Sequence, residues 1–384
     1  MNTNFILNSN KIRLNPLRIQ TKTSHVFGDL QVHFDTLSNF FKNPNTSDFT
    51  VNIDDFNFDL EDVFVLAPDL STNAIASKLA QHDFSGNFKF DGNLEYIDLS
   101  SLKMNWGQNT SIFLEGNARL MDSLDDIDFE MTKFQIASSK TDVLDVMEEV
   151  QIGISLPQSF EISGFMNKKG QQYSTFTNLR TDFGDLKLEG NIGLNEEIDY
   201  EMILQLDSLK LSQLFGNTSL GDLNMSIASE GQGESLTNLT AKLNSKIDSI
   251  HLGGYVYKGF EIKADIDKGY GKTNLDYYDD NLQFDFTSSF NLDSLSSTID
   301  ILLDLKGIRP QRLGLTKKDF KAKTKIKLHF EGNYDAFKFD ALLNDGLVIY
   351  DQTPYHLGKF QVSSIVDSTQ TSVKAGSDFF EAQL

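Results

Sequence analysis

The stretch from Phe84 to Leu120 alternates so regularly between side-chain types that it limits what this chain can fold into. Between Phe84 and Tyr96, every even position is apolar or glycine and every odd position is polar. Successive side chains of an extended strand point to opposite faces, so a period of two places all the apolar residues on one face. The pattern predicts β-strands, and a sheet with one apolar face and one polar face.

The same alternation recurs along the chain. In residues 110–120 the apolar face carries Ile112 and Leu114, and Phe113 is the only apolar residue on the polar side. The most regular alternation runs from Ala322 to Tyr334, where four lysines share the polar face: Lys321, Lys323, Lys325 and Lys327. A basic connector, residues 309–321, precedes this strand.

A short motif, apolar–acidic–Gly–Asn, recurs within several of the expected strands. It occurs at residues 90–93, 114–117, 188–191 and 330–333. The spacing is irregular, so we interpret it as a repeat of strands rather than a strict solenoid period. Glycine on an apolar strand face leaves a gap or lets the strand bend. A one-residue change of phase between Ile53 and Phe56 indicates a β-bulge.

These patterns predict an all-β fold: an elongated, curled antiparallel sheet that forms a taco-like hydrophobic groove, with a few short helices. Residues 141–150 give the strongest helix pattern, with Thr141 or Asp142 as the N-cap. A sheet of twenty or more strands must twist, curl or split, so a sandwich, a barrel and an open gutter all remain possible closures. We expect residues 1–384 to be one repetitive β-groove segment, with possible subdivisions at 1–80, 81–150, 151–306 and 307–384.

Composition excludes several functions. The formal net charge of −21 argues against nucleic acid and against an anionic membrane surface as partners, because both need clustered Lys and Arg. The absence of cysteine excludes disulfides and thiolate chemistry. The six histidines are scattered without metal-ligand spacing, and no nucleophile–base arrangement is present. We therefore expect no enzyme activity, no cofactor and no metal site.

The apolar face is the feature with functional potential. An apolar surface of this extent, left open, is an interaction site, and acyl chains would fill it well. We expect the lining of a lipid groove to include Phe88, Phe90, Leu94, Ile112, Leu114, Leu188, Leu204, Phe284, Ile326, Leu328 and Phe330.

The sequence resembles a known family in residues 63–70, 84–94, 102–110, 114–116, 134–145 and 183–190. These stretches look like TamB proteins of Bacteroidota, of the AsmA-like, translocation and assembly module type. The resemblance implies a taco-shaped β-groove in the periplasm that holds acyl chains. It further implies phospholipid transport between the inner and outer membranes and support of outer-membrane protein assembly, with an Omp85-class outer-membrane protein as partner.

The resemblance also implies a tether to the inner membrane through a part of the protein outside this segment. Residues 1–10 do not read as a signal peptide, and we expect the sequence to be an internal segment of a longer protein. Two alternative interpretations are an outer-membrane β-barrel and an extracellular structural or adhesive β-protein. In a membrane barrel the apolar face would point outward to lipid. An adhesive protein would bind through its loops.

Overall fold

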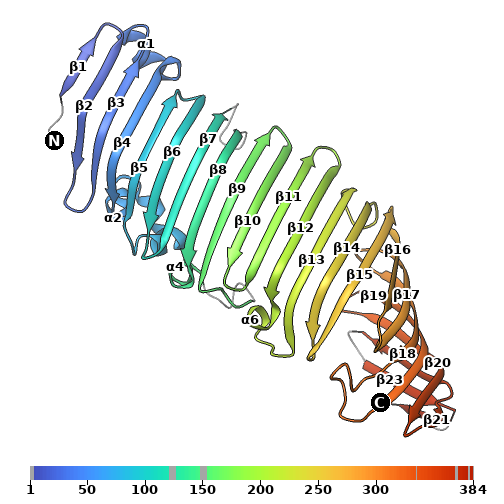
Figure 1. Ribbon diagram of the computed structural model, residues 1–384. Helices are drawn as coiled ribbons and strands as arrows, with labels where there is room; N and C mark the ends of the chain where they lie inside the picture. Colours follow the sequence, from blue (N-terminus) through green and yellow to red (C-terminus); the bar gives the residue numbers. More distant parts are fainter. Residues whose placement is uncertain are drawn as a thin grey trace. The chain divides into compact units, whose positions relative to one another are not determined.

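The computed structural model describes residues 4–120, 127–147, 154–333, 335–367, 371–378 and 381–383, and it confirms an all-β chain with short helices (Figure 1). The chain forms two compact units. Unit 1 comprises residues 1–191 and 213–216, and unit 2 comprises residues 192–212 and 217–384. The subdivisions expected from the sequence stay predictions. Val150 and Tyr334, which end two of the expected elements, lie outside the described residues.

Unit 1 is built from antiparallel strands in which each strand from β1 to β9 pairs with the next one in the sequence. The strands are β1 (Phe5–Asn8), β2 (Lys11–Gln20), β3 (His25–His33), β4 (Asp48–Phe58), β5 (Phe84–Gly92), β6 (Tyr96–Trp106), β7 (Thr110–Leu120), β8 (Ile127–Ser139), β9 (Ser159–Lys169) and β10 (Gln172–Thr181). β11 (Gly184–Leu194) contains the boundary with unit 2.

Unit 2 continues the same meander, and all its strand pairs are antiparallel. Its strands are β12 (Ile198–Lys210), β13 (Leu220–Gln232), β14 (Thr240–Leu252), β15 (Tyr255–Asp267), β16 (Tyr270–Tyr278), β17 (Leu282–Asn291), β18 (Ser297–Ile308), β19 (Phe320–Gly332), β20 (Phe337–Tyr350), β21 (Thr353–His356), β22 (Phe360–Val366), β23 (Thr371–Ser377) and β24 (Glu381–Gln383). β20 is shared, because its first half pairs with β22 and its second half with β21. Among the described residues β1 pairs only with β2 and β24 only with β23, so neither unit closes on itself.

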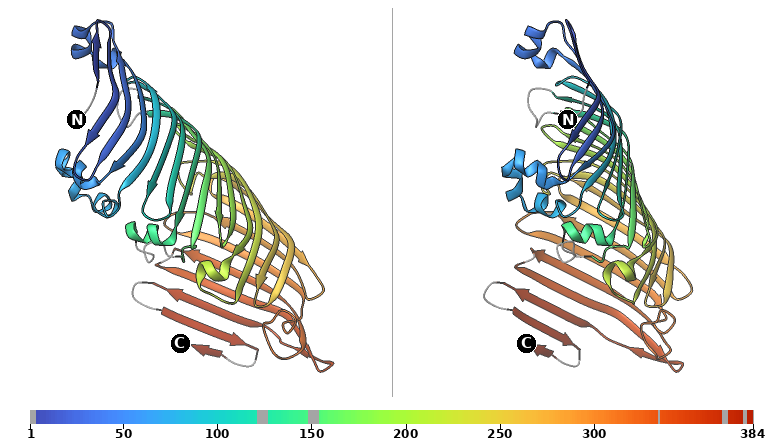
Figure 2. Two further views of the ribbon diagram at one scale, coloured as in Figure 1. Left: turned by 60° about the vertical axis from the view of Figure 1, so that its left-hand side comes forward. Right: turned by 90° about the vertical axis from the view of Figure 1, so that its left-hand side faces the viewer.

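The helices are short and lie at the ends of strands, beside the sheet rather than across it (Figure 2). They are α1 (Leu37–Lys42), η1 (Pro44–Thr46), α2 (Leu60–Leu66), η2 (Pro68–Thr72), α3 (Ala74–Leu79), α4 (Lys140–Val146) and α6 (Leu211–Phe215). α4 confirms the helix expected at 141–150, but its N-cap is Ser139, whose hydroxyl accepts a hydrogen bond from the Asp142 amide. Asp142 has a different role, described below.

Unit 1 is bent by a band of β-bulges that the hydrogen-bond register reveals. The bulges occur in alternate strands, where β2, β4, β6 and β8 each contribute one residue more than their partners. The phase change between Ile53 and Phe56 is one of them, which confirms the bulge expected there. A bulge bends its strand and increases the local twist. Four of them side by side therefore curl the sheet along one line.

In three copies of the apolar–acidic–Gly–Asn motif, at Gly92, Gly116 and Gly332, the glycine has a steric reason. At Gly116 a Cβ atom would lie 2.2 Å from the Glu130 carbonyl oxygen of the neighbouring strand. At Gly332 a Cβ would lie 2.2 Å from the Ala336 carbonyl oxygen. Both backbones have φ in a range that side chains disfavour, 157° and 140°. Only glycine allows this close approach, and Gly116 lies within the bulge shared by β7 and β8.

Candidate functional site: the apolar sheet faces

The apolar side chains of unit 1 stand opposite one another from strand to strand. Phe88 pairs with Ile53 on one side and Leu102 on the other, and Leu102 pairs in turn with Leu114. The full row, which we call the central row, is Leu17, Gly28, Ile53, Phe88, Leu102, Leu114, Phe134 and Gly164. Every bulge of unit 1 lies directly beside it, so the curl of the sheet follows this apolar line.

Two of the other residues expected in the groove flank the central row. Ile112 pairs with Met104 and Ile136, and Phe90 pairs with Val51 and Leu99. The rings of Phe88 and Phe90 stack with centroids 6.1 Å apart. Phe88 also packs against the buried cluster of Leu17, Ile53 and Phe56. The structure thus brings Phe88, Phe90, Ile112 and Leu114 together on one face, as the alternation predicts.

Of the two remaining residues expected in unit 1, Leu188 lies on the predicted strand face and Leu94 does not. Leu188 lies on β11 and is half-buried between exposed Lys187 and Glu189, in keeping with the predicted face. Leu94 is not on a strand. β5 ends at Gly92, and the Asn93 side chain accepts hydrogen bonds from the amides of residues 95 and 96 to form a turn. Leu94 is exposed in this turn, so the expectation of one strand running to Tyr96 was wrong.

In unit 2 the five expected residues also share one face. Leu204 pairs with Ile227, and Phe284 pairs with Tyr277 and Leu305. The three residues on β19 lie two apart, and each faces apolar residues of β18 and β20. Ile326 stands between Leu303 and Leu343, Leu328 between Ile301 and Ala341, and Phe330 between Ile299 and Phe339. Register shifts occur next to Phe284 in β17 and next to Leu305 in β18, so unit 2 also bends along an apolar line.

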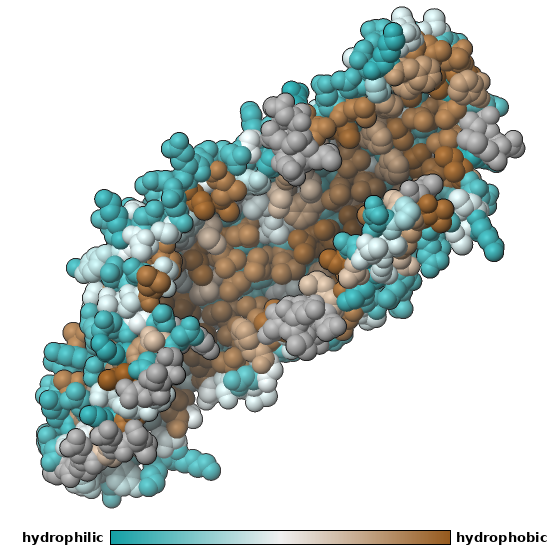
Figure 3. Space-filling view, turned by 180° about the vertical axis from the view of Figure 1, so that it is seen from behind, coloured by the Kyte–Doolittle hydropathy of each residue, from teal (hydrophilic) through white to brown (hydrophobic). Residues whose placement is uncertain are grey.

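Among the residues that the structure describes, no second layer packs over the apolar faces. The chain exposes 23750 Å² of surface, whereas two separate compact bodies of half its mass would together expose about 18,000 Å². Among the described residues, fifteen apolar side chains are buried, and ten of the eleven expected lining residues are only half-buried. Figure 3 shows the apolar floor of unit 1 at the upper right, hollowed between hydrophilic margins.

The polar face of β7 carries Phe113, the apolar residue that breaks the alternation of that strand. Its cross-strand partners are Lys103 and Gln135, which confirms that it faces away from the central row. The ammonium group of Lys133 lies 4.9 Å from the centre of its ring. A cation over an aromatic face is attracted by the ring quadrupole. Phe113 is therefore accommodated on the polar face of the sheet by a cation–π contact.

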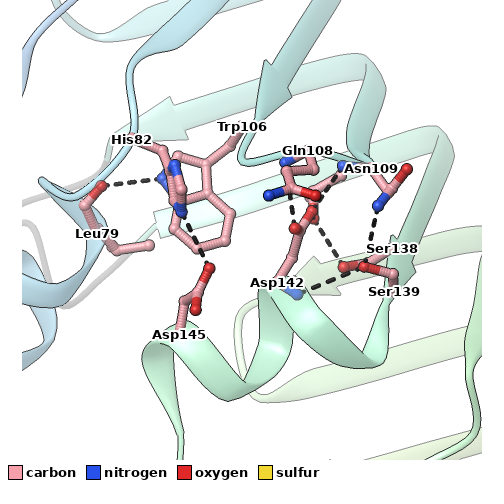
Figure 4. Close-up of polar contacts among 10 residues, drawn as sticks. Leu79, His82, Trp106, Gln108, Asn109, Ser138, Ser139, Asp142 and Asp145 are labelled. Carbon is pink, nitrogen blue, oxygen red and sulfur yellow. Dashed lines mark hydrogen bonds and ion pairs between the residues drawn. The ribbon is translucent and has the colours of Figure 1, made fainter.

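One margin of the unit 1 face is fixed by a polar network around α3 and α4 (Figure 4). Trp106, at the end of β6, donates its indole N–H to the Leu79 carbonyl at 2.9 Å. The Lys78 ammonium donates to the Val146 carbonyl at 3.0 Å, and His82 Nε2 lies 2.9 Å from an Asp145 carboxylate oxygen. These contacts attach α3 to α4 and both helices to the sheet.

Asp142 is the centre of this network and is fully buried. Its carboxylate accepts hydrogen bonds from the amides of Gln108 and Asn109 at 3.1 and 2.8 Å, and from the Thr110 hydroxyl at 2.7 Å. Burial by itself would raise the pKa of Asp142, but these hydrogen bonds outweigh it and hold the pKa below its ordinary value. Sequence reasoning treated Asp142 as a cap, because only the fold brings the β6–β7 turn to it.

Two other carboxylates gather hydroxyl donors. Asp279 accepts hydrogen bonds from the hydroxyls of Tyr255 and Tyr277, and Asp62 accepts them from the hydroxyls of Thr21, Thr23 and Ser24. Four histidines each lie near a single carboxylate: His25 near Asp55, His82 near Asp145, His251 near Asp222, and His329 near Asp300. Within the described ranges, no group of three or more His, Asp or Glu residues could hold a metal ion. Across those same ranges, every helix is too short or too polar to cross a membrane.

Comparison of the sequence with models of known protein families gives no match, and comparison with curated proteins also gives none. The candidate site therefore stands on its geometry: in each unit, a sheet face of aligned apolar side chains that is bent by bulges and left open.

Proposed function

We propose that the apolar sheet faces of this protein bind the acyl chains of phospholipids. The observation that carries this proposal is that aligned apolar rows on curled sheets are half-exposed, with no covering layer in the part of the chain that the structure describes. Each methylene group that leaves water for an apolar surface contributes about 0.8 kcal/mol. A chain of a dozen or more methylenes lying along such a row therefore gains substantially, even when it is only partly covered.

The chemistry of the two faces supports a lipid rather than a compact apolar ligand. Phe88, Leu102 and Leu114 form a continuous line across successive strands, and neighbouring strands are about 4.8 Å apart. A line of this kind suits a long, flexible hydrocarbon chain, whereas a small ligand needs an enclosed pocket. The polar face, in a chain of net charge −21, keeps the opposite side in water.

The resemblance to TamB proteins extends this proposal to a cellular role. On that basis we propose transport of phospholipid between the inner and outer membranes, together with support of outer-membrane protein assembly. A periplasmic location, an inner-membrane tether and an Omp85-class partner belong to the same proposal. The open apolar faces are compatible with this role.

The test compares two adjacent residues that point to opposite faces. Leu114→Asp introduces a charge in the central row, and Phe113→Asp introduces the same charge on the polar face. The 384-residue chain is purified from bacteria, and native mass spectrometry with lipid extraction measures the phospholipid bound per protein molecule. We expect the wild type and Phe113→Asp to carry phospholipid and Leu114→Asp to lose most of it, because an acyl chain cannot solvate a carboxylate.

Circular dichroism of all three proteins serves as the control for folding. A folded wild type without lipid would contradict the proposal, as would equal lipid loading of the two variants. Unfolding of Leu114→Asp alone would indicate that Leu114 belongs to a closed core, in which case the half-exposed face seen here would not exist in solution.

A further inference from the structure

The positive charge of this acidic protein is concentrated in one short segment of unit 2. Residues 306–327 hold nine of the 34 lysines and arginines but only one of the 55 acidic residues, Asp319. The segment therefore has a local net charge of +8 within a chain of net charge −21. Charges in water act over a Debye length of about 8–10 Å, so a partner that approaches this segment experiences its local charge rather than the average of the chain.

The connector between β18 and β19 is held by buried side chains and backbone hydrogen bonds. Leu313, on the connector, is 1% exposed, and Pro310 is also buried. The Arg309 amide donates to the Asn281 carbonyl at 2.8 Å, which ties the connector to the β16–β17 turn. The Leu315 amide donates to the Pro310 carbonyl at 2.9 Å and closes a compact turn. The basic side chains are thus displayed from a fixed support at one edge of unit 2.

Most of these basic side chains have no acidic partner. Lys306 is paired with Asp285. Among the residues that the structure describes, no ion pair involves the other eight: Arg309, Arg312, Lys317, Lys318, Lys321, Lys323, Lys325 and Lys327. All of them except Arg309 are exposed. The acids beside the group are Asp319 on the connector and Asp304, the cross-strand partner of Lys325; they are too few to neutralise it.

Exposed apolar side chains lie among these charges. Leu315, at the turn of the connector, is 65% exposed. Ile349 is the cross-strand partner of Lys321, and Tyr350 is the partner of Phe320 at the start of β19. Ile349 and Tyr350 are both exposed. The orange and red end of the ribbon in Figure 2 shows the connector beside the tip of the β20–β21 hairpin. We call this group of residues, Arg312, Leu315, Lys317, Lys318, Lys321, Ile349 and Tyr350, the basic edge.

We propose that the basic edge docks unit 2 onto the surface of a bilayer that contains anionic phospholipids. Lysine and arginine side chains are attracted to anionic headgroups, while Leu, Ile and Tyr side chains enter the boundary between headgroups and acyl chains. Exposed aliphatic residues among unpaired cations favour a lipid surface over an acidic protein or a nucleic acid, whose contacts with cations are mainly polar. The strongly negative net charge of the chain disfavours an anionic lipid surface only when charge is averaged over all residues.

Vesicle co-sedimentation of the 384-residue chain tests the proposal. The probes are phosphatidylcholine vesicles with and without about one-third phosphatidylglycerol. The patch variant combines Arg312→Glu, Lys317→Glu, Lys318→Glu and Lys321→Glu. The control variant combines Lys242→Glu, Lys246→Glu, Lys263→Glu and Lys272→Glu, four exposed lysines on β14, β15 and β16 that change the net charge by the same amount.

We expect the wild type and the control variant to bind the anionic vesicles, and raised salt to weaken this binding. The patch variant should lose at least about 100-fold in its partition coefficient. Equal binding by the two variants would overturn the proposal, as would the absence of wild-type binding to anionic vesicles at low salt. Sedimentation velocity without vesicles tests whether the basic edge instead binds a second copy of this chain. Self-association that the patch variant abolishes would assign the basic edge to the acidic surface of that second copy.

The inference does not rest on the acyl-chain proposal, and the two can fail separately. Leu114→Asp lies in unit 1 and leaves the basic edge unchanged. This variant should bind anionic vesicles as the wild type does, even where it carries no extracted lipid. A Leu315→Asp variant adds a test of the apolar contact, since it should weaken vesicle binding while keeping the four basic residues.

Discussion

Replacing Asp142 should detach α4 from the β6–β7 turn and destabilise unit 1, and the hydrogen bonds of its carboxylate give the size of the effect. The buried carboxylate uses one oxygen for the Gln108 amide and the other for the Asn109 amide and the Thr110 hydroxyl. Asp142→Ala leaves the two amides without their partner, whereas the Thr110 hydroxyl keeps Ser138 Oγ at 2.7 Å. Each unsatisfied buried donor costs about 1–3 kcal/mol. Water reaches the exposed turn and offsets part of this loss, so we expect unit 1 to lose about 2–4 kcal/mol of unfolding free energy.

Asp145→Ala is the matched control, because it lies one turn later on α4 and is partly exposed. It removes only the ion pair with His82, which should cost less than about 1 kcal/mol. Urea unfolding measures the free energies, and hydrogen exchange of residues 108–110 reports the turn directly. Faster exchange in Asp142→Ala but not in Asp145→Ala is the expected result. Equal unfolding free energies and unchanged exchange at Gln108 and Asn109 would refute the role assigned to Asp142.

Three further predictions follow from local geometry. Gly116→Ala should destabilise unit 1 by about 1–3 kcal/mol, because the Cβ of the alanine would overlap the Glu130 carbonyl oxygen. A thermal unfolding midpoint of the variant equal to that of the wild type would contradict this. Asp142, and Asp279, which accepts hydrogen bonds from the hydroxyls of Tyr255 and Tyr277, have lowered pKa values because hydrogen bonds outweigh the effect of burial. Their stabilisation is present above the unfolded pKa of about 3.9 and is lost as the pH falls through their folded values. Urea midpoints measured from pH 5 to pH 3 should fall, and less steeply in Asp142→Asn. Trp106→Phe removes the hydrogen bond from the indole N–H to the Leu79 carbonyl and should cost about 1 kcal/mol of unfolding free energy. Proteolysis between α3 and β5 should become faster. An unchanged cleavage rate would argue against the attachment of α3 to the sheet through Trp106.

The bulges illustrate what sequence reasoning could reach in part. The phase change at Ile53 and Phe56 is visible along one strand, and it predicts a single bulge. The alignment of the bulges in β2, β4, β6 and β8 beside one apolar row depends on how the strands register against each other. Register is a relation between residues distant in sequence, so no one strand contains it. The turn at Leu94 was missed for a local reason: Asn93 caps the turn, although the alternation of side chains continues through it.

The alternation by itself determined which side chains share a face, because the side-chain period of a strand is fixed at two residues. It placed Phe88, Leu114, Leu328 and Phe330 correctly, and it singled out Phe113 as the exception. Whether that face would be covered or open was decided only by the tertiary structure. A sandwich and an open curled sheet have the same alternating strands, and they differ in whether a second layer packs on the apolar side. That packing is a contact between distant parts of the chain, which a local pattern of residues does not specify.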